Sequence, residues 1–451
     1  MAGRNKAPEA PRDTKLTKLS PRNSTPTLVD ANSTPSATAS QEKSALRALS
    51  EGWKNQPVLS YYLILVTTLL LFIIGFILVF SASTITALES GANPFLSFGK
   101  RSLIYVAALL VLFIASRVPL TFYQKWTWWF LGAAWLLQIM VFVPGMHGTS
   151  AGGNTNWINL GGVITIQPSE FMKLALAVAL GRVLADPELR EARDKKRWLI
   201  NAGVPAVGSL GLVMIGRDLG TAMVMAALIL SAIFVAGIPW RYFAGIVLLG
   251  IFGVTLAVMS SANRRRRVFG FMDASTTDPT GIGYQRQHGL WSLATGGLTG
   301  VGPGASREKW SYLPEADTDY IFAILGEEFG ILGTFLVLGL FVVLCLTMMR
   351  LMNSETNQFV SYTVAGMMGW IFSQAIINIG AVVGLLPIIG VPLPLISSGG
   401  SSLLSIMAAM GMMMCFARAE PGADAALKAR LRPLRLSLIH ISEPTRRYAI
   451  S

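Results

Sequence analysis

Residues 59–82 have the sequence LSYYLILVTTLLLFIIGFILVFSA, which contains no charged side chain. An α-helix needs about 20 predominantly apolar residues to cross the hydrocarbon core of a bilayer, and this stretch is long enough to do so. The composition of the whole chain agrees, because 52% of its 451 residues are hydrophobic and only 14% are charged. That balance is far from the balance of a soluble globular domain. The sequence therefore predicts an integral membrane protein.

Nine further apolar stretches follow the first, so we expect an all-α integral membrane protein that folds as a ten-span helical bundle. A large extracellular loop is expected between spans 7 and 8. The fourth and fifth stretches are interrupted by glycines and by Lys173 and Arg182, and the eighth is too long for one simple span. The predicted spans cover residues 59–82, 102–117, 126–143, 169–185, 198–215, 220–237, 241–260, 320–349, 359–384 and 403–417.

The positive charge of the chain follows its predicted topology. Much of the net charge of +13 comes from the two tails and the short loop at 190–197, which is the pattern of cytoplasmic segments. The loops at 144–168 and 385–402 contain no Lys or Arg, so we expect them outside the cell and both termini in the cytoplasm. The run Arg264–Arg267 falls on the outer side, in a loop too long for the rule to apply strongly. Topology and anionic lipid headgroups thus account for the charge, and no nucleic-acid partner is expected.

The segments that flank the predicted bundle differ from it in composition. Residues 1–58 are rich in Ser, Thr, Pro, Ala and Lys and predict a disordered cytoplasmic tail. The first apolar stretch comes too late for a cleavable signal peptide, so it is expected to anchor the chain uncleaved. Residues 59–417 form the predicted membrane domain, and residues 418–435 a basic cytoplasmic tail. Residues 436–451 resemble translated sequencing-adapter sequence and are left out of the functional argument.

No pattern of metal-ligating side chains is present in the sequence. Cys345 and Cys415 both lie in apolar stretches, as small buried hydrophobic residues do, and the three histidines are scattered along the chain. We therefore expect neither a disulfide framework nor a metal site built from side chains.

A group of carboxylates precedes the eighth predicted span. Residues 313–322 have the sequence LPEADTDYIF, which places Glu315, Asp317 and Asp319 at a membrane surface, directly before an apolar helix. The pKa of a carboxyl rises where the dielectric constant falls, and its basicity can then serve catalysis. Glu315 and Asp317 are interpreted as solvated acids. Asp319 adjoins the apolar stretch and is either solvated as well or a catalytic base.

The outer loop before the fourth span contains a second set of candidate residues. Trp157 is either an aromatic anchor at the membrane interface or a substrate contact. Pro168 suits the first turn of a helix, on which Glu170 and Lys173 share one face. Charged residues inside a span are costly and mark functional sites, although this pair could serve only to orient helices.

Two further segments could meet an anionic group. Arg217 and Asp218 lie between spans 5 and 6, where Arg217 could bind a phosphate or the two could form a structural turn. Gln285 and Arg286 precede a glycine-rich stretch at 296–304, whose amide groups could approach an anion. No Walker pattern is present, so the sequence does not support nucleotide binding.

The segment 387–402 holds three prolines, two adjacent glycines and four serines between two apolar stretches. Non-helical backbone persists at membrane depth only where it is buried in protein or lines a cavity. A re-entrant segment is therefore predicted, with Ser397 and Ser398 facing a polar cavity and with Gln374 and Asn378 on the preceding span. The alternative is an interfacial hairpin that only closes the bundle.

Taken together, these motifs resemble the SEDS family (shape, elongation, division and sporulation), and within it the cell-division branch, with an actinobacterial arrangement. The resemblance covers residues 59–417. It implies a ten-span fold and an enzyme that polymerises lipid II at the division septum, beside a class B penicillin-binding protein and other division proteins. The motifs that carry it occur in family order: NWINLG, QPSE-x-x-K, RDLGTA, YQ-x-x-x-GL, GGLTGVGPG, LPEADTDYIFAILGEEFG and PLPLISSGGSS.

The resemblance also implies roles for individual residues. It identifies Asp319 as the essential aspartate, Trp157 as the important tryptophan of the outer loop, and Glu170 with Lys173 as the pair of the QPSE-x-x-K motif. The chain departs from the family at three positions, where relatives often have Pro, His and Tyr, and where this chain has Arg217, Asp317 and Ser398.

An α-linked diphosphate donor that becomes a β-linked strand implies inversion in a single displacement. Such a step needs a base for the acceptor hydroxyl and a group that stabilises the departing diphosphate. Asp319 is the expected base, and the diphosphate is expected at Arg217, Lys173 or Arg286, assisted by a divalent cation such as magnesium. The complete predicted substrate-binding set is Trp157, Glu170, Lys173, Arg217, Asp218, Gln285, Arg286, Ser397 and Ser398.

Two alternative functions stay open at this point. A transporter that flips lipid II would also use broken helices and charges inside the membrane, but it would need no base at the outer surface. A family member that acts in cell elongation would use the same chemistry at a different place in the cell.

Overall fold

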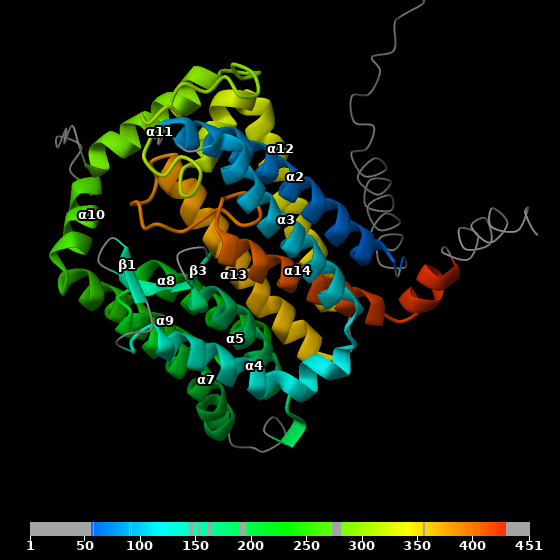
Figure 1. Ribbon diagram of the computed structural model, residues 1–451. Helices are drawn as coiled ribbons and strands as arrows, with labels where there is room; N and C mark the ends of the chain where they lie inside the picture. The colour runs from blue at the N-terminus through cyan, green and yellow to red at the C-terminus, as the bar shows by residue number, and fades with distance from the viewer. Residues whose placement is uncertain are drawn as a thin grey trace, which may run out of the picture. The chain divides into compact units, whose positions relative to one another are not determined.

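The computed structural model describes residues 56–429, apart from gaps at 57, 90, 92, 144–147, 152–153, 161–163, 189–194, 273–280 and 355–356. The predicted N-terminal tail, except for Gln56 and Val58, and the whole of 436–451 lie outside these residues. Figure 1 shows a chain that is helical almost throughout. The helices are α2 (Leu59–Glu89), α3 (Pro94–Arg117), α4 (Leu120–Met140), α5 (Pro168–Leu184), α7 (Lys195–Ile215), α8 (Leu219–Val235), α9 (Trp240–Met259), α10 (Ala262–Met272), α11 (Ile282–Gly296), α12 (Ile321–Ser354), α13 (Gln358–Val382) and α14 (Gly400–Ala419).

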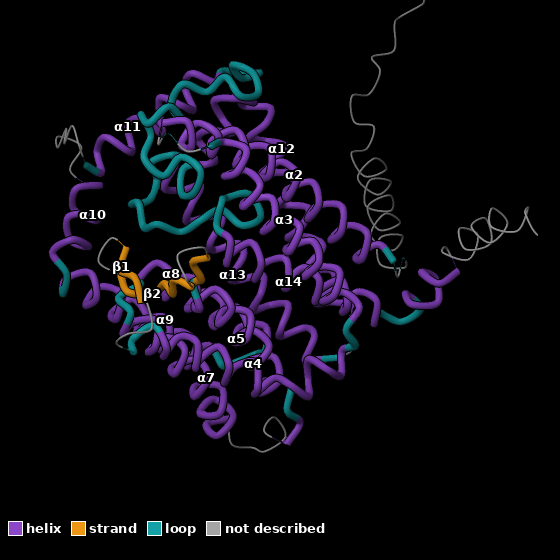
Figure 2. Tube along the Cα trace, in the orientation of Figure 1, coloured by secondary structure: helices purple, strands orange, loops and turns teal. Residues whose placement is uncertain are grey.

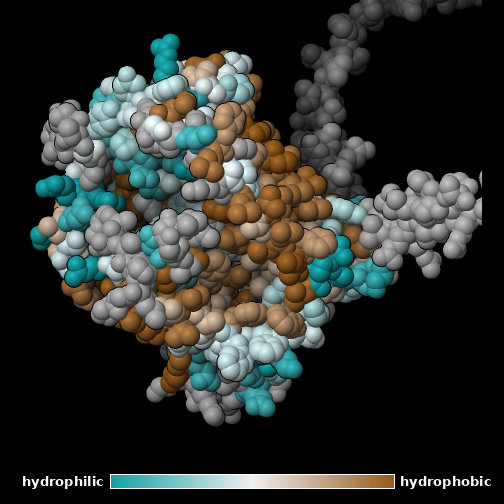
Figure 3. Space-filling view, viewed as in Figure 1, coloured by the Kyte–Doolittle hydropathy of each residue, from teal (hydrophilic) through white to brown (hydrophobic). Residues whose placement is uncertain are grey.

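The long helices coincide with the predicted apolar stretches, and α10 and α11 lie in the predicted loop between the seventh and eighth of them. Among the described residues, five helices are long and apolar enough to cross a membrane, or up to six if the bent pair α3–α4 is one span. Figure 3 shows hydrophobic residues gathered over the face formed by α2 and α3. Exposed Leu103, Val106 and Phe113 contribute to this face, as expected for a surface that contacts lipid chains. The chain is a multi-pass helical membrane protein.

A glycine divides the stretch that is too long for one simple span. Gly330, inside α12, has non-helical angles (φ 64°, ψ −161°). A Cβ atom at this position would lie 2.4 Å from the main-chain nitrogen of Gly300, so only glycine allows the two segments to approach this closely. The break separates a short helical piece, residues 321–329, from the long apolar helix that follows.

A small antiparallel sheet departs from the predicted all-α class. Strands β1 (Gly148–Ala151), β2 (Asn154–Leu160) and β3 (Ile164–Ile166) pair in the order β1–β2–β3. They occupy the predicted outer loop before α5, where Thr and Ile residues favour extended backbone. The sequence analysis missed them because strands this short carry little periodic signal.

α5 lies in the interior of the bundle, where it packs against α4, α7, α8, α13 and α14. Nearly all of its residues are buried. This position explains the weak hydropathy of the fourth predicted span, because α5 contacts protein rather than lipid. A helix in this position can carry charged side chains whose partners lie on its neighbours.

The segment between α13 and α14, residues 383–399, contains no helix, and most of its residues from 391 to 397 are buried. Figure 2 shows it as a loop, and its buried residues lie inside the bundle rather than on its surface. Its tightest contact is with α2, because a Cβ atom on Gly75 would lie 2.6 Å from both Ile396 Cα and the Leu395 carbonyl oxygen. The structure therefore contains the buried, non-helical segment that the prolines and glycines predict.

Replacement of Gly75 by Ala is expected to destabilise the protein, because the added methyl group meets backbone that cannot rotate away. Overpacking of this kind typically costs about 1–3 kcal/mol. Gly250→Ala in α9 is the matched control, since its added methyl group meets no atom within 4 Å and alanine favours helix. Thermal unfolding of the two purified variants in one detergent measures the difference. Equal melting temperatures would show that the 383–399 segment is not seated on Gly75.

Candidate active site

Asp319 is the penultimate residue of a non-helical segment, residues 313–320, that leads into α12. Three consecutive main-chain carbonyl groups of this segment accept hydrogen bonds from α13 and from residues 383–399. The three bonds run from Ser398 N to the Asp317 oxygen (2.9 Å), from Ser397 Oγ to the Thr318 oxygen (2.6 Å) and from Asn378 Nδ2 to the Asp319 oxygen (2.8 Å). The backbone that carries Asp319 is thereby fixed, although it belongs to no helix or strand.

The environment of Asp319 favours its neutral form. Burial is the largest cause, Glu315 and Asp317 add to it, and Arg267 of α10 acts in the opposite direction, so that the pKa of Asp319 is raised to about 7. This is the direction expected for a carboxyl placed directly before an apolar helix. A carboxyl with a pKa near neutrality is well matched to accepting a proton at physiological pH.

A cavity of about 1220 Å³ has walls from the start of α8, the end of α9, the start of α10 and residues 387–389. None of residues 313–320 lines it. Two observations relate it to Asp319. Arg267, which acts on the pKa of Asp319, is a lining residue. Gly390, which follows lining residue Ile389 in the chain, is close to Asp319, because a Cβ atom on it would be 3.5 Å from Asp319 Oδ2.

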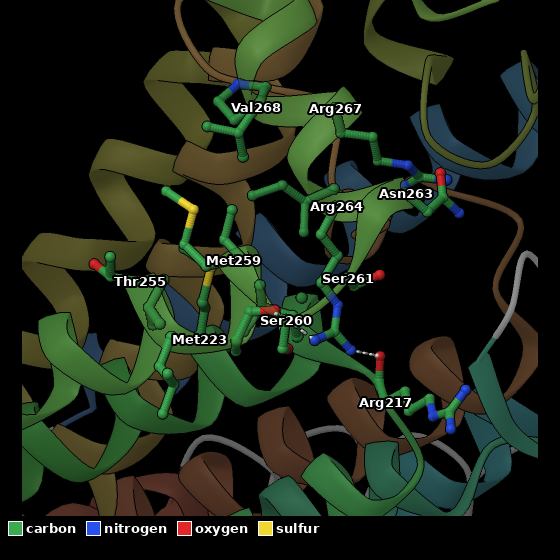
Figure 4. Close-up of a pocket in the computed structure, with 18 of the residues that line it drawn as sticks. Arg217, Met223, Thr255, Met259, Ser260, Ser261, Asn263, Arg264, Arg267 and Val268 are labelled. Atoms are coloured by element: carbon green, nitrogen blue, oxygen red, sulfur yellow. Dashed lines mark hydrogen bonds between the residues drawn. The ribbon is translucent and has the colours of Figure 1, made fainter.

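The lining of the cavity combines cations with apolar side chains. Arg217, Arg264 and Arg267 supply the positive charge, and Met223 and Phe269 belong to the apolar part. Figure 4 shows Arg264 reaching from α10 toward the turn before α8, where it donates to the Arg217 carbonyl oxygen at 2.6 Å. Such a lining suits an amphipathic anion, with its charge at the arginines and its apolar part along the methionines and phenylalanine.

The two predicted residues before α8 take different structural positions. Asp218 caps α8 by accepting from Thr221 N at 3.0 Å and from Thr221 Oγ1 at 2.8 Å, and it also accepts from Gln167 Nε2 at 3.3 Å. Arg217 adopts a left-handed conformation (φ 61°), and its side chain is exposed at the cavity. The geometry therefore gives Asp218 the role of a helix cap and leaves the guanidinium of Arg217 accessible.

Glu170 and Lys173 form a buried ion pair inside the bundle. Lys173 Nζ donates to Glu170 Oε1 at 2.7 Å and to Gln374 Oε1 at 3.0 Å. The Lys173 side chain is 1% exposed and the Glu170 side chain 3%. Gln374 Nε2 in turn donates to the Pro392 carbonyl oxygen at 2.9 Å. The ammonium group also lies 5.1 Å from the ring centre of Trp370, a cation–π contact. The pair thus joins α5 to α13 and to the 383–399 segment.

α11 brings Gln285 and Arg286 to the same end of the bundle. Gln285 Nε2 donates to the Pro314 carbonyl oxygen at 3.1 Å, next to the carboxylate segment. Arg286 lies over the ring of Phe271 at 4.9 Å and points toward the Gly384 carbonyl oxygen at 3.5 Å. Both side chains therefore hold loops together around Asp319.

Trp157 lies in β2, half-buried, on the small sheet. The sheet is docked on the turn before α8, since Thr155 N donates to the Gly216 carbonyl oxygen at 3.1 Å. A Cβ atom on Gly216 would meet Asn156, so this contact also requires a glycine. The docking places the strand that carries Trp157 beside the turn that carries Arg217.

Two features of the site were missed or misread in the sequence analysis. Arg264 and Arg267 were treated only as an exception to the charge rule, although a run of arginines on the outer side was itself a signal of an anion-binding role. Asp317 was interpreted as a solvated acid, which is wrong, because Arg101 of α3 donates to its Oδ2 atom at 2.7 Å. That contact joins residues 216 positions apart, and no local pattern could indicate it.

Comparison with known proteins identifies the family. The model of the FtsW, RodA and SpoVE family, described as cell cycle proteins, matches residues 61–421. The probable peptidoglycan glycosyltransferase FtsW of Mycobacterium tuberculosis is 33% identical over 377 residues, covering 84% of this chain and 71% of that protein. The stage V sporulation protein E of Bacillus subtilis is 35% identical over 357 residues, covering 79% of this chain and 96% of that protein.

Solved structures agree with this assignment. A structure concerned with polymerisation and crosslinking by a peptidoglycan synthase complex contains a chain that superposes with a TM-score of 0.63 at 25% identity, covering 79% of this chain and 97% of that one. The rod shape determining protein RodA of Thermus thermophilus superposes with a TM-score of 0.57 at 24% identity, covering 79% and 96%, and shares the fold. The chain therefore belongs to the SEDS family, which is the family of FtsW, RodA and SpoVE.

Proposed function

We propose that the protein is a peptidoglycan glycosyltransferase that polymerises lipid II into β-1,4 glycan strands at the division septum, with release of undecaprenyl diphosphate. The relatives named FtsW support the activity and the division role. The single observation that carries the proposal is that Arg267, which acts on the pKa of Asp319, also lines a cavity of arginines and apolar side chains. A donor that joins a sugar to a long isoprenoid through a diphosphate needs all of these groups.

In this mechanism Asp319 is the general base. Its ionised carboxylate accepts the proton of the acceptor 4-hydroxyl group while the hydroxyl oxygen attacks the anomeric carbon of the donor. The bond to the diphosphate breaks with its electron pair on the leaving oxygen, and the configuration at the anomeric carbon inverts. With a pKa of about 7, Asp319 is substantially ionised at neutral pH and still basic enough to take the proton.

The departing diphosphate is assigned to Arg264 and Arg267, with Arg217 close by. Guanidinium groups pair with phosphate oxygens bidentately and stabilise charge that develops on a leaving group. Lys173, a candidate from the sequence, is instead paired with Glu170 in the bundle interior. Within the described residues, no three His, Cys, Asp or Glu side chains converge on a metal position.

We also propose ten spans, with both termini in the cytoplasm and the active site outside. Arg350 donates to Ser60 Oγ and Ser354 donates to Glu420 Oε1, so the start of α2, the end of α12 and the residues after α14 gather at one end. The other end of the bundle carries the carboxylate segment and the cavity. The loop between the seventh and eighth spans then contains α10 and α11 and faces the cell exterior.

Arg267→Gln is expected to raise the KM for lipid II by about tenfold, since a hydrogen bond to a charged group contributes about 1.5–3 kcal/mol. The pH at which activity is half-maximal should also rise, because Arg267 opposes the elevated pKa of Asp319. Arg266→Gln is the matched control: it removes the same charge from an exposed position of α10 that does not line the cavity. Initial rates measured over a range of lipid II concentrations, at several pH values, give both the KM and the pH of half-maximal activity. Equal KM values for the two variants would remove Arg267 from the binding site.

The proposed function is tested with the purified protein, a class B penicillin-binding protein as partner, and labelled lipid II. We expect polymer together with undecaprenyl diphosphate. Movement of lipid II across liposomes without polymer would instead support the transporter. A fluorescently tagged copy that localises to the septum supports division, and one that localises along the side wall supports elongation.

A further inference from the structure

Asp317, two residues before Asp319, is held by two elements that lie far from it in the chain. Arg101 of α3 donates to its Oδ2 atom at 2.7 Å, and Ser398 Oγ donates to the same oxygen at 3.0 Å. Ser398 also donates through its main-chain nitrogen to the Asp317 carbonyl oxygen at 2.9 Å. These contacts therefore fix both the side chain and the backbone of Asp317.

Arg101, one of the two partners of Asp317, belongs to a more regular part of the structure than the segment that it holds. Arg101 lies on α3, which packs closely against α14 and α2, and so belongs to the regular part of the bundle. Residues 313–320 form no long helix or strand, and their conformation depends on contacts with other segments. The ion pair is the charged contact that connects this segment to α3.

We propose that Arg101, Asp317 and Ser398 form a positioning clamp, which orients the segment that carries the base and sets the charge around it. The proposal rests on the function above, in which Asp319 accepts the proton. Arg101 and Asp317 act through Asp319 and are positioning residues, since neither is placed at the reacting atoms. Asp317 is one of the three positions at which the chain departs from the family, whose members often have His there.

The clamp has an electrostatic consequence. The charged groups that face Asp319 are Glu315 and Asp317 on its own segment and Arg267 on α10. The 383–399 segment contains no charged residue, and the α13 contact, Asn378, is neutral. Paired with Arg101, Asp317 acts as half of a neutral pair. Without Arg101, its full negative charge would face the base.

Opposite pH shifts are therefore expected from the two halves of the clamp. Arg101→Gln should move the pH of half-maximal kcat/KM upward, and Asp317→Asn should move it downward. The double variant should return close to the parent. Both single variants should also lower kcat about tenfold to a hundredfold, as small misplacements of a catalytic group do, with little change in KM. Arg101→Lys keeps the charge and should keep the pH midpoint.

The measurement is polymer formation from lipid II between pH 5.5 and 8.5, with the class B partner present. Arg307→Gln, which removes an exposed cation of the same outer loop, is the control that should behave as the parent. If the parent polymerises and Asp319→Asn does not, unchanged pH midpoints in Arg101→Gln and Asp317→Asn would overturn the clamp alone. If Arg101→Gln does not fold, Asp317→Asn still decides through kcat: the lost charge alone moves its pH midpoint downward, whereas a kcat equal to that of the parent would overturn the clamp. A parent without polymerase activity would refute the proposed function, and the clamp with it.

Discussion

Asp319→Asn is expected to abolish glycan polymerisation while the protein remains folded in the membrane. The substitution is nearly isosteric, but an amide cannot accept a proton at neutral pH. Loss of a positioned general base typically costs about 10²–10⁴-fold in rate. The backbone should stay in place, because Asn378 holds the Asp319 carbonyl group and not its side chain. Polymer formed from lipid II by the purified variant, beside the parent, measures the loss.

The raised pKa of Asp319 gives this prediction a dependence on pH. Activity of the parent should rise as the pH passes through about 7, where the carboxyl ionises. The folded pKa lies above the ordinary value of aspartate, so ionisation costs stability, fully above about pH 7 and progressively less as the pH falls toward that ordinary value. The Asn variant avoids this cost and should melt at or above the parent temperature at pH 8, with a smaller difference at pH 5. Near-normal polymer, or a variant that melts well below the parent at pH 8, would contradict the assignment.

Lys173→Met is expected to destabilise the protein strongly. It leaves Glu170 without its cation at a position that is almost fully buried, and breaking a buried pair typically costs about 3–5 kcal/mol. Glu170→Gln should also destabilise, since Lys173 then loses its anion and keeps only the neutral contacts with Gln374 and Trp370. The double variant Glu170→Gln, Lys173→Met contains no buried charge that lacks its ion-pair partner. Its loss of stability should therefore be clearly smaller than the sum of the two single losses.

The control for this cycle is an ion pair of the same kind at the surface. Lys428 and Asp424 are 75% and 46% exposed and lie 2.6 Å apart, and pairs this exposed contribute little to stability because water screens them. Lys428→Met should therefore leave the melting temperature almost unchanged in the same detergent. Additive losses at Glu170 and Lys173, in both melting temperature and polymer formation, would show that the two residues are not coupled.

Local patterns in the sequence were enough to predict the helical part of the fold. Uninterrupted apolar stretches predicted α2 and α13, and Pro168 marked the first turn of α5. The eighth stretch was recognised as too long for one simple span, but the break at Gly330 that divides it was not predicted. The three-stranded sheet was not predicted, because Thr and Ile favour strands only weakly in segments so short.

For the candidate site, too, features set by neighbouring residues could be predicted, and features set by contacts between distant segments could not. The position of Asp319 before an apolar helix is a local pattern, and it was sufficient to indicate a raised pKa. The cavity arginines and the contact between Arg101 and Asp317 depend on which distant segments meet. Ser397 is a clear example: it was expected to face a polar cavity, whereas its hydroxyl group is buried and donates to the Thr318 carbonyl oxygen. The contact between Ser397 and Thr318 cannot be deduced from a single sequence.

The order in which the chain is synthesised bears on how the 383–399 segment holds Asp319. Ser397 follows Thr318 by 79 residues, which takes several seconds at a translation rate of about 5–20 residues per second. During that interval Arg101 and Gln285 can already hold residues 313–320 through Asp317 and Pro314, but the hydrogen bonds from Asn378 and Ser397 to the backbone around Asp319 cannot yet form. The 383–399 segment must also reach Gly75 on α2, which is made about 300 residues earlier. Under the proposed mechanism, the full support of the base is therefore expected only after residues 383–399 have been synthesised.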